Sequence, residues 1–210
     1  MFVKECFRIQ DPGEFVRLFS SPRLDTYLGA CSGDLERALH LHAWNAAVGA
    51  AFYVPLQHLE VAIRNAMDRE LSQTMGPAWL DDPRLPSRSQ QRVREARAMA
   101  GGSGRAPPDI IAALSFGFWV GLLQRQADPL WRLCLHRAFG HAKARRDEVH
   151  KRLDHLREFR NRIAHHEPIF GRHLAADLAS ILTVAGWISA QLRDWIAHHD
   201  HVTAVLAAKP

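Results

Sequence analysis

The chain has 210 residues, of which 47% are hydrophobic and 23% are charged. This composition excludes an intrinsically disordered chain, and the length suits one well-buried domain. The 27 Lys and Arg residues outnumber the 22 Asp and Glu residues, and the resulting net charge of +5 favours a polyanionic partner such as RNA over an acidic one.

Helical patterns dominate the chain, and no strand-like alternation competes with them. The patterns predict an all-α fold with one domain over 1–210. We expect helices over 22–28, 34–50, 55–76, 88–100, 110–123, 129–140, 143–165 and 174–197, followed by a C-terminal tail over 198–210. In this reading Pro55 begins a new helix, because proline is well tolerated in a first helical turn.

The three cysteines, Cys6, Cys31 and Cys134, are widely spaced and include no Cys-x-x-Cys pair. This pattern is typical of a reduced protein that has neither a disulfide framework nor a zinc site. The N-terminal stretch lacks the apolar core of a signal peptide, and the longest apolar run, 110–123, is too short to span a bilayer. We therefore expect a cytoplasmic protein with no metal, no cofactor and no membrane partner.

The segment RNRIAHHE, residues 160–167, carries the strongest chemical signal. Metal-independent RNA cleavage needs a group that moves protons and a group that holds the charge developing on the phosphate oxygens. Histidine can be the acid or base, arginine can clamp the phosphate, and asparagine can orient either one. Arg160, Asn161 and His165 are therefore the candidate catalytic residues, with RNA as the substrate.

The spacing alone carries little weight, because three other arginines in the chain also precede a histidine by five positions. Arg160 differs from those three because an asparagine follows it directly. It also falls on the next regular slot of an apolar seam formed by Val149, Leu153, Leu156 and Ile163. A charge on a core seam must be paired or face a cleft, so Arg160 is either a phosphate ligand or the partner of a buried acid such as Glu60.

One geometric difficulty concerns the distance between Arg160 and His165. Five residues of continuous helix turn the chain by about 500°, which separates the two side chains around the helix axis. Pro168 disfavours helical geometry at Glu167, so the helix should end near His165. Either the last turn is distorted or two copies of the motif meet across a homodimer, and we favour the homodimer.

Five segments extend the signal beyond the motif: RLDTYL (23–28), ALHLHAWN (38–45), LEVAIRN (59–65), LSFGFWVGLL (114–123) and LREFRNRIAHHEPIF (156–170). Together they resemble the Abi-like (abortive infection) family of the HEPN superfamily. The resemblance implies a HEPN-like helical bundle that dimerises to form a composite cleft. It also implies metal-independent endoribonuclease activity in phage defence or as a toxin, and a toxin raises the question of a cognate antitoxin as partner. It places Arg160, Asn161 and His165 at the catalytic positions, with His166 as the alternative histidine.

A second Arg-Asn pair, Arg64 and Asn65, has no histidine at the matching spacing. Glu60 and Arg64 lie one helical turn apart in the favourable acid-first order, so we expect them to pair. This pair either contacts Arg160 and His165 and holds them in position, or it forms a salt bridge on the surface.

Three functions remain open from the sequence. The first is an endoribonuclease, and the second is a non-catalytic RNA-binding or regulatory HEPN protein that keeps the cleft without turnover. The third is a structural module in which the motif only holds a dimer together, and it predicts no RNA binding.

Overall fold

The computed structural model describes residues 9–101, 107–140 and 144–210. All regular elements in these ranges are helical, which confirms the all-α class. The α-helices are α1 (Pro12–Phe19), α2 (Ser21–Ala30), α3 (Leu35–Met75), α4 (Ser87–Met99), α5 (Pro107–Ala113), α6 (Phe116–Gly121), α7 (Asp128–Leu133), α8 (Arg146–Ala164), α9 (Leu174–Ile188), α10 (Ala190–His198) and α11 (Val202–Ala207). Three short 3-10 helices join them: η1 (Trp79–Asp81), η2 (Arg125–Ala127) and η3 (Leu135–Phe139).

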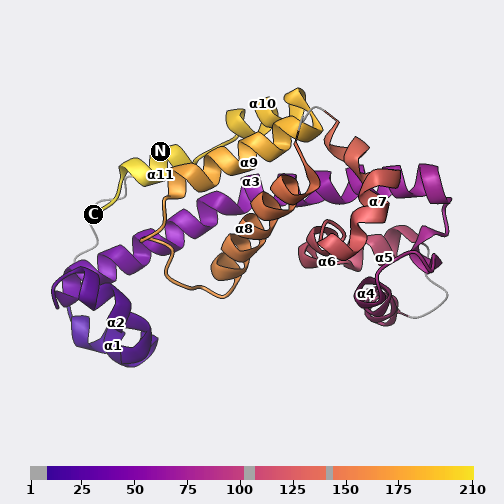
Figure 1. The fold of residues 1–210 in the computed structure, drawn as a ribbon. Helices are drawn as coiled ribbons and strands as arrows, with labels where there is room; N and C mark the ends of the chain where they lie inside the picture. The colour runs from indigo at the N-terminus through magenta and orange to yellow at the C-terminus, as the bar shows by residue number, and fades with distance from the viewer. Residues whose placement is uncertain (1–8, 102–106, 141–143) are drawn as a thin grey trace.

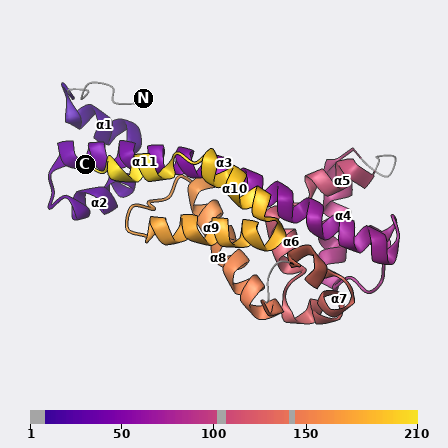
Figure 2. The ribbon, with the colours of Figure 1, turned by 90° about the horizontal axis from the view of Figure 1, so that it is seen from above.

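Helix α3 runs along the length of the molecule and the other helices are arranged around it (Figure 1). Helices α1 and α2 pack at one of its ends, and α4 to α7 gather at the other. Helices α9 and α11 pack along its side, and α10 packs on α9 (Figure 2). Helix α8 crosses α3 and contacts α9 and α6, so the end of α8 that carries the motif lies between the two groups of helices.

The prediction of two helices over 34–50 and 55–76 was wrong, because α3 continues through Pro55 without a break. A proline inside a helix removes one backbone hydrogen bond and costs about 3 kcal/mol or more. Burial on both sides of Pro55 offsets that cost: Phe52, Leu59 and Ile63 are fully buried and contribute to the same core.

The contact between α3 and α8 is centred on two aromatic rings. Phe159 of α8 is fully buried and meets Phe52 of α3 edge-on, with the ring centroids 4.8 Å apart. Arg172, in the connection after α8, lies over the ring of Phe159, with its guanidinium carbon 4.9 Å from the ring centroid. These contacts fix the position of α8 along α3 and the rotation of α8 about its own axis. They therefore determine which α8 residues face outward.

Within the described residues, α3 is the one helix whose length and composition would allow it to cross a membrane. The core helix of a soluble protein meets the same criterion, so the finding carries little weight. In this structure α3 has buried side chains from Ala38 to Leu71 and serves as the scaffold of the bundle.

Three predicted helices are each divided in the structure. The stretch 110–123 breaks before Ser115 into α5 and α6, and the stretch 129–140 breaks at Cys134 into α7 and η3. The stretch 174–197 breaks at Ser189, whose backbone is extended and whose Oγ accepts a hydrogen bond from Leu192 N–H at the start of α10. Each break lets residues on more than one side of a continuous apolar run reach the core, which a single straight helix could not do.

The two ends of the described chain are more ordered than the sequence suggested. Helix α1 was not predicted, although Asp11 accepts a hydrogen bond from Gly13 N–H and caps it. The expected tail contains α11, where Val202 is fully buried and the Val205 carbonyl accepts a 2.8 Å hydrogen bond from Trp44 Nε1 of α3. The segment after α10 therefore belongs to the packed bundle.

The cysteines contribute no cross-link in the described part of the chain. Cys31 and Cys134 are free and buried, and burial raises the pKa of the Cys134 thiol. Cys6 lies outside the described residues.

Candidate active site

Helix α8 ends at the motif, as predicted, with His165 as its C-cap. The N–H of His166 donates to the Ile163 carbonyl at 3.0 Å, and the N–H of Glu167 donates to the Arg162 carbonyl at 2.9 Å. These two bonds form a Schellman motif, which needs one residue in the left-handed region and usually places glycine there. Here that residue is His166, with φ at 56°.

A non-glycine residue in this conformation costs about 1 kcal/mol or more. The surrounding chain holds it in place, because Arg23 of α2 donates a 2.7 Å hydrogen bond to the His166 carbonyl. The turn that carries both histidines is therefore strained locally and tied to a distant helix.

Asn45 of α3 fixes the segment that follows the turn. Its side chain is buried, and its Oδ1 accepts hydrogen bonds from Ile169 N–H at 2.7 Å and Phe170 N–H at 3.1 Å. Asn45 was not among the predicted site residues. The available signal was an asparagine on the buried face of the segment ALHLHAWN, where an unsatisfied amide would be costly.

Arg160 does not occupy the core seam, so that expectation was wrong. Phe159 takes the buried position, because the face of α8 that meets α3 shifts by one residue as the two helices cross. Arg160 lies at the exposed edge of α8, and its Nε is 3.5 Å from Oε2 of Glu60 on α3. The ion pair with Glu60 that the sequence suggested is present, but it is partly exposed rather than buried.

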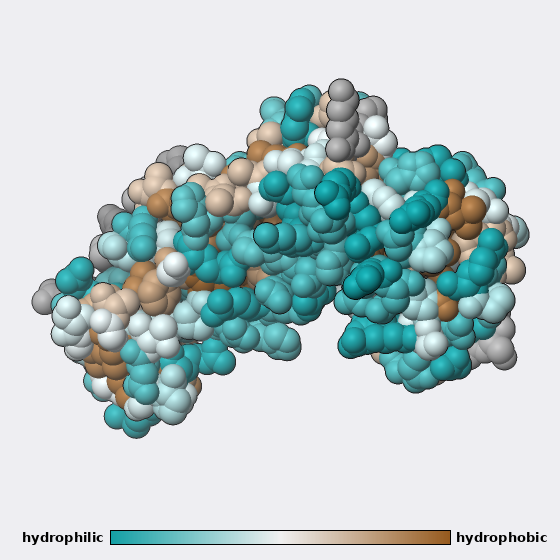
Figure 3. Space-filling model, viewed as in Figure 1, coloured by the Kyte–Doolittle hydropathy of each residue, from teal (hydrophilic) through white to brown (hydrophobic). Residues whose placement is uncertain are grey.

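Arg160 separates two hollows on the surface. The first, the α3 cavity, has a volume of about 290 Å³ and lies between α3 and α8, where Glu60 and Arg64 share it with Arg160. The second, the Asn161 cavity, has a volume of about 180 Å³ and is lined by Arg92, Ser115, Phe116, Gly117, Arg157, Arg160 and Asn161. Hydrophilic side chains dominate the middle of the face shown in Figure 3, which is hollowed between the two ends of the molecule.

The second Arg-Asn pair lies beside the site without duplicating it. Glu60 pairs with Arg160 across the helices rather than with Arg64 one turn away, which corrects the expected pairing. Arg64 instead donates a 3.2 Å hydrogen bond to the side-chain oxygen of the exposed Asn65. Glu60 therefore contacts a predicted catalytic residue directly.

His165 is exposed and is not among the described residues that line either cavity beside Arg160. His166 lines a third hollow of about 470 Å³, the His166 cavity, together with His42 and Asn45. An acid or base must come within hydrogen-bond reach of the atom whose proton it transfers. The His166 cavity shares Tyr53, Ile163 and Ala164 with the α3 cavity, so His166 borders a hollow that adjoins Arg160, whereas His165 lines neither cavity beside Arg160.

A buried carboxylate anchors the connection after the motif. Asp177 of α9 is paired with Arg172, with Nη2 3.0 Å from Oδ1, and accepts a 2.8 Å hydrogen bond from Nε2 of His155. The group ties α8 and the following connection to α9, a structural role. Among the described residues no cluster of three or more His, Cys, Asp or Glu side chains is arranged to hold a metal ion.

The arginines of the Asn161 cavity were also missed by the sequence reading. Arg157 precedes Asn161 by four residues, so the two share a face of α8, and this spacing was visible in the sequence. Arg92 comes from α4 and reaches the same cavity only through the tertiary fold.

Comparison with known proteins found no matching family model, no matching curated protein and no matching solved structure. The resemblance to the Abi-like family therefore stays a prediction. The function has to be argued from the geometry of the chain itself.

Proposed function

We propose that this protein is a metal-independent endoribonuclease of the HEPN, Abi-like type, acting in the cytoplasm in phage defence or as a toxin. The observation that carries the proposal is the Asn161 cavity. There Arg160, the predicted phosphate ligand, and Asn161 meet two further arginines, Arg92 and Arg157. Converging guanidinium groups are suited to hold the charge that builds up on a phosphate during cleavage.

In the proposed reaction the ribose 2′-OH attacks the adjacent phosphorus. The 2′ proton passes to a base, the bond from phosphorus to the 5′ oxygen breaks, and that oxygen takes a proton from an acid. The products are a 2′,3′-cyclic phosphate and a 5′-OH. Arg160 holds a non-bridging oxygen, Asn161 orients the phosphate, and a histidine supplies the proton transfer.

A homodimer supplies the missing histidine in this proposal. Exposed apolar side chains lie on α3 beside the α3 cavity, with Tyr53 at 64%, Val54 at 39% and Val61 at 38% exposure. Exposed apolar groups of this kind favour a protein contact. In the proposed dimer a second copy docks on this surface about a twofold axis, and we assign its His165 to complete the site at Arg160.

One observation favours the alternative of a non-catalytic RNA-binding or regulatory protein. Glu60 already partners Arg160, which reduces the charge that this arginine presents to a phosphate. RNA cleavage decides between the two functions.

The test is cleavage of total RNA and tRNA in the presence of EDTA by the wild-type protein, Arg160→Ala and His165→Ala. We expect each variant to lose about 100-fold or more of the activity. Arg162→Ala is the matched control, because Arg162 lies on the same helical turn but pairs with Glu167. Full activity in both test variants would refute the site, and RNA binding without cleavage by the wild type would establish the alternative.

A further inference from the structure

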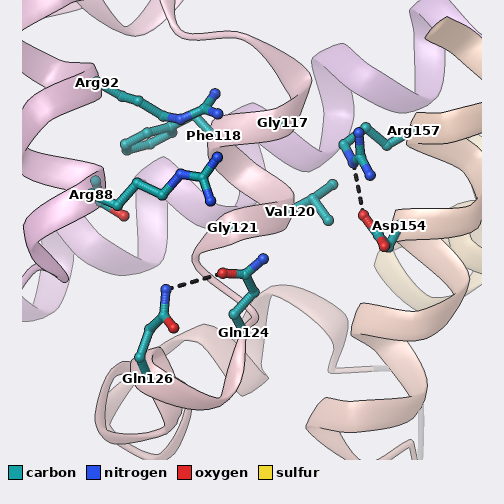
Figure 4. A pocket seen from close by; sticks show the side chains of 11 residues that line it. Arg88, Arg92, Gly117, Phe118, Val120, Gly121, Gln124, Gln126, Asp154 and Arg157 are labelled. Carbon is teal, nitrogen blue, oxygen red and sulfur yellow. Dashed lines mark hydrogen bonds and ion pairs between the residues drawn. The ribbon is translucent and has the colours of Figure 1, made fainter.

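A pocket of about 210 Å³ adjoins the Asn161 cavity, and Figure 4 shows the side chains that line it. Arg88 and Arg92 extend into it from α4, and Arg157 faces them from α8. Gln124 and Gln126 close one side. We call this hollow the arginine pocket.

The charges in the arginine pocket are not balanced. Arg157 Nε donates a 2.7 Å hydrogen bond to Asp154, which is the one carboxylate among the described lining residues. Within the described part of the chain, neither Arg88 nor Arg92 has an ion-pair partner, and Arg92 makes only a 3.5 Å hydrogen bond to Ser115 Oγ. Arg157 also lies 3.6 Å from Glu158, measured from Nη2 to Oε1, so two carboxylates neutralise this arginine. The positive charge of the pocket therefore comes from Arg88 and Arg92, and bound anionic oxygens would relieve the repulsion between them.

The donors in the pocket suit phosphate oxygens. A guanidinium group presents several N–H donors in a planar fork that can hold two oxygens at once. Gln126 Nε2 donates a 3.0 Å hydrogen bond to Gln124 Oε1, so the Gln124 amide nitrogen remains available as a neutral donor.

Two glycines leave room for a ligand. Gly117 and Gly121 lie one turn apart on α6 and both line the pocket. A Cβ on Gly121 would meet nothing within 4 Å, whereas a Cβ on Gly117 would touch Arg157 and Arg92 side-chain atoms at 3.6 Å. The wall at Gly121 is therefore bare backbone facing open space.

We propose that the arginine pocket binds a phosphate group, and that Arg88 and Arg92 are its principal ligands. Arg92, Gly117 and Arg157 line both this pocket and the Asn161 cavity, so the two hollows are continuous. A phosphate held here can belong to the RNA strand that also contacts Arg160, or to a separate nucleotide. The assignment to the RNA strand rests on the proposed function, whereas phosphate binding as such does not.

The test measures binding rather than cleavage. A labelled, uncleavable 2′-O-methyl RNA oligonucleotide is titrated with the wild-type protein and with Arg88→Gln, Arg88→Gln/Arg92→Gln and Gly121→Leu. We expect Arg88→Gln to weaken binding by about tenfold, since a charge-assisted hydrogen bond contributes about 1.5 kcal/mol or more. The double variant should also lower the salt dependence of log K by about 0.7, because the contact with one phosphate is lost. Gly121→Leu should weaken binding by filling the pocket without changing its charge.

Arg94→Gln is the matched control, because Arg94 lies on α4, is exposed and bonds Gln91 instead of lining the pocket. Circular dichroism confirms that each variant is folded. Unchanged RNA and nucleotide binding in Arg88→Gln and Gly121→Leu, or an equal loss in Arg94→Gln, would overturn the proposal. So would a wild-type protein that binds neither RNA nor nucleotide.

Calorimetric titration with a nucleoside 5′-monophosphate separates the two sources of phosphate. Loss of RNA binding alone in Arg88→Gln identifies a backbone phosphate, and loss of mononucleotide binding identifies a terminal one. A wild-type protein that needs Arg88 to bind RNA but does not cleave it keeps the pocket and rejects the nuclease. If the wild-type protein cleaves RNA while Arg88→Gln and Gly121→Leu bind RNA and nucleotide as tightly as the wild type, the nuclease is supported and the phosphate pocket is rejected.

Discussion

The two sides of Arg160 differ in chemistry. On the side of Asn161, the neighbouring side chains include Arg92 and Arg157, and the surface continues into the arginine pocket. On the side of α3, the neighbours are the acid Glu60, one arginine, Arg64, and exposed apolar groups such as Val61.

A polyanion and a protein surface make opposite demands. The arginine side favours phosphates, whereas the exposed apolar side chains around Glu60 favour a protein contact. In the proposed function, Arg160 therefore lies where the RNA-binding surface meets the surface that docks a second copy. Under this proposal, Arg160 of one chain and His165 of a second chain form one site at that boundary.

The largest expected effect comes from charging the α3 side. Val61→Glu places an acid on the exposed apolar surface beside Glu60, and like charges desolvated at an interface cost several kcal/mol. We expect self-association to weaken by about 100-fold, which corresponds to about 2.7 kcal/mol. Sedimentation equilibrium measures this change.

RNA cleavage should fall with the loss of the dimer, while mononucleotide binding in the arginine pocket should persist. Met99→Glu is the matched control, because it adds the same charge at an exposed apolar residue, 76% exposed, at the far end of α4. A Val61→Glu protein that associates and cleaves as the wild type does would remove the distinction between the two sides.

A smaller effect is expected from Glu60→Gln, which releases Arg160 from its acid. The pair is partly exposed, so the free energy of unfolding should change by less than about 1 kcal/mol. RNA should bind several-fold more tightly, because a carboxylate no longer competes with phosphate for the guanidinium group. Denaturant unfolding and RNA titration check the two parts, and loss of folding with no gain in binding would show that the pair is purely structural.

The smallest expected effect is a pH dependence at the His166 cavity, next to the α3 side. Burial, and to a lesser extent the charge of Arg23, lower the pKa of His42 below its usual 6.5. The unfolded chain then binds the proton more tightly, so this contribution to stability is complete above about pH 6.5 and is lost as pH falls below it. Thermal unfolding at pH 7.5 and 5.5 should show less acid sensitivity in His42→Phe, while His40→Phe should retain the wild-type sensitivity.

Local patterns in the sequence were enough to predict some features of the fold and the site. The all-α class, the end of α8 at His165 and the proximity of Glu60 to Arg160 follow from helical periodicity, from Pro168 and from simple charge pairing. The separation of Arg160 from His165 follows from the pitch of the helix alone.

The features that were missed depend on tertiary packing. Proline is usually found in the first turn of a helix, but here the burial of residues on both sides of Pro55 outweighs the lost hydrogen bond. Arg160 leaves the seam because Phe159 fits against Phe52 at the helix crossing. The convergence of Arg92 with Arg157 joins residues far apart in the chain, and no local spacing reports it.

The most direct test of the central claim, a site shared between two chains, is complementation between inactive variants. Arg160→Ala and His165→Ala are each inactive in this account, and they are mixed under conditions that allow subunits to exchange. Half of the dimers are then mixed, and each mixed dimer has one site with both residues intact, so about one quarter of wild-type RNA cleavage should return. If Arg160 and His165 act within the same chain, mixing restores no activity, and that result would contradict the shared site.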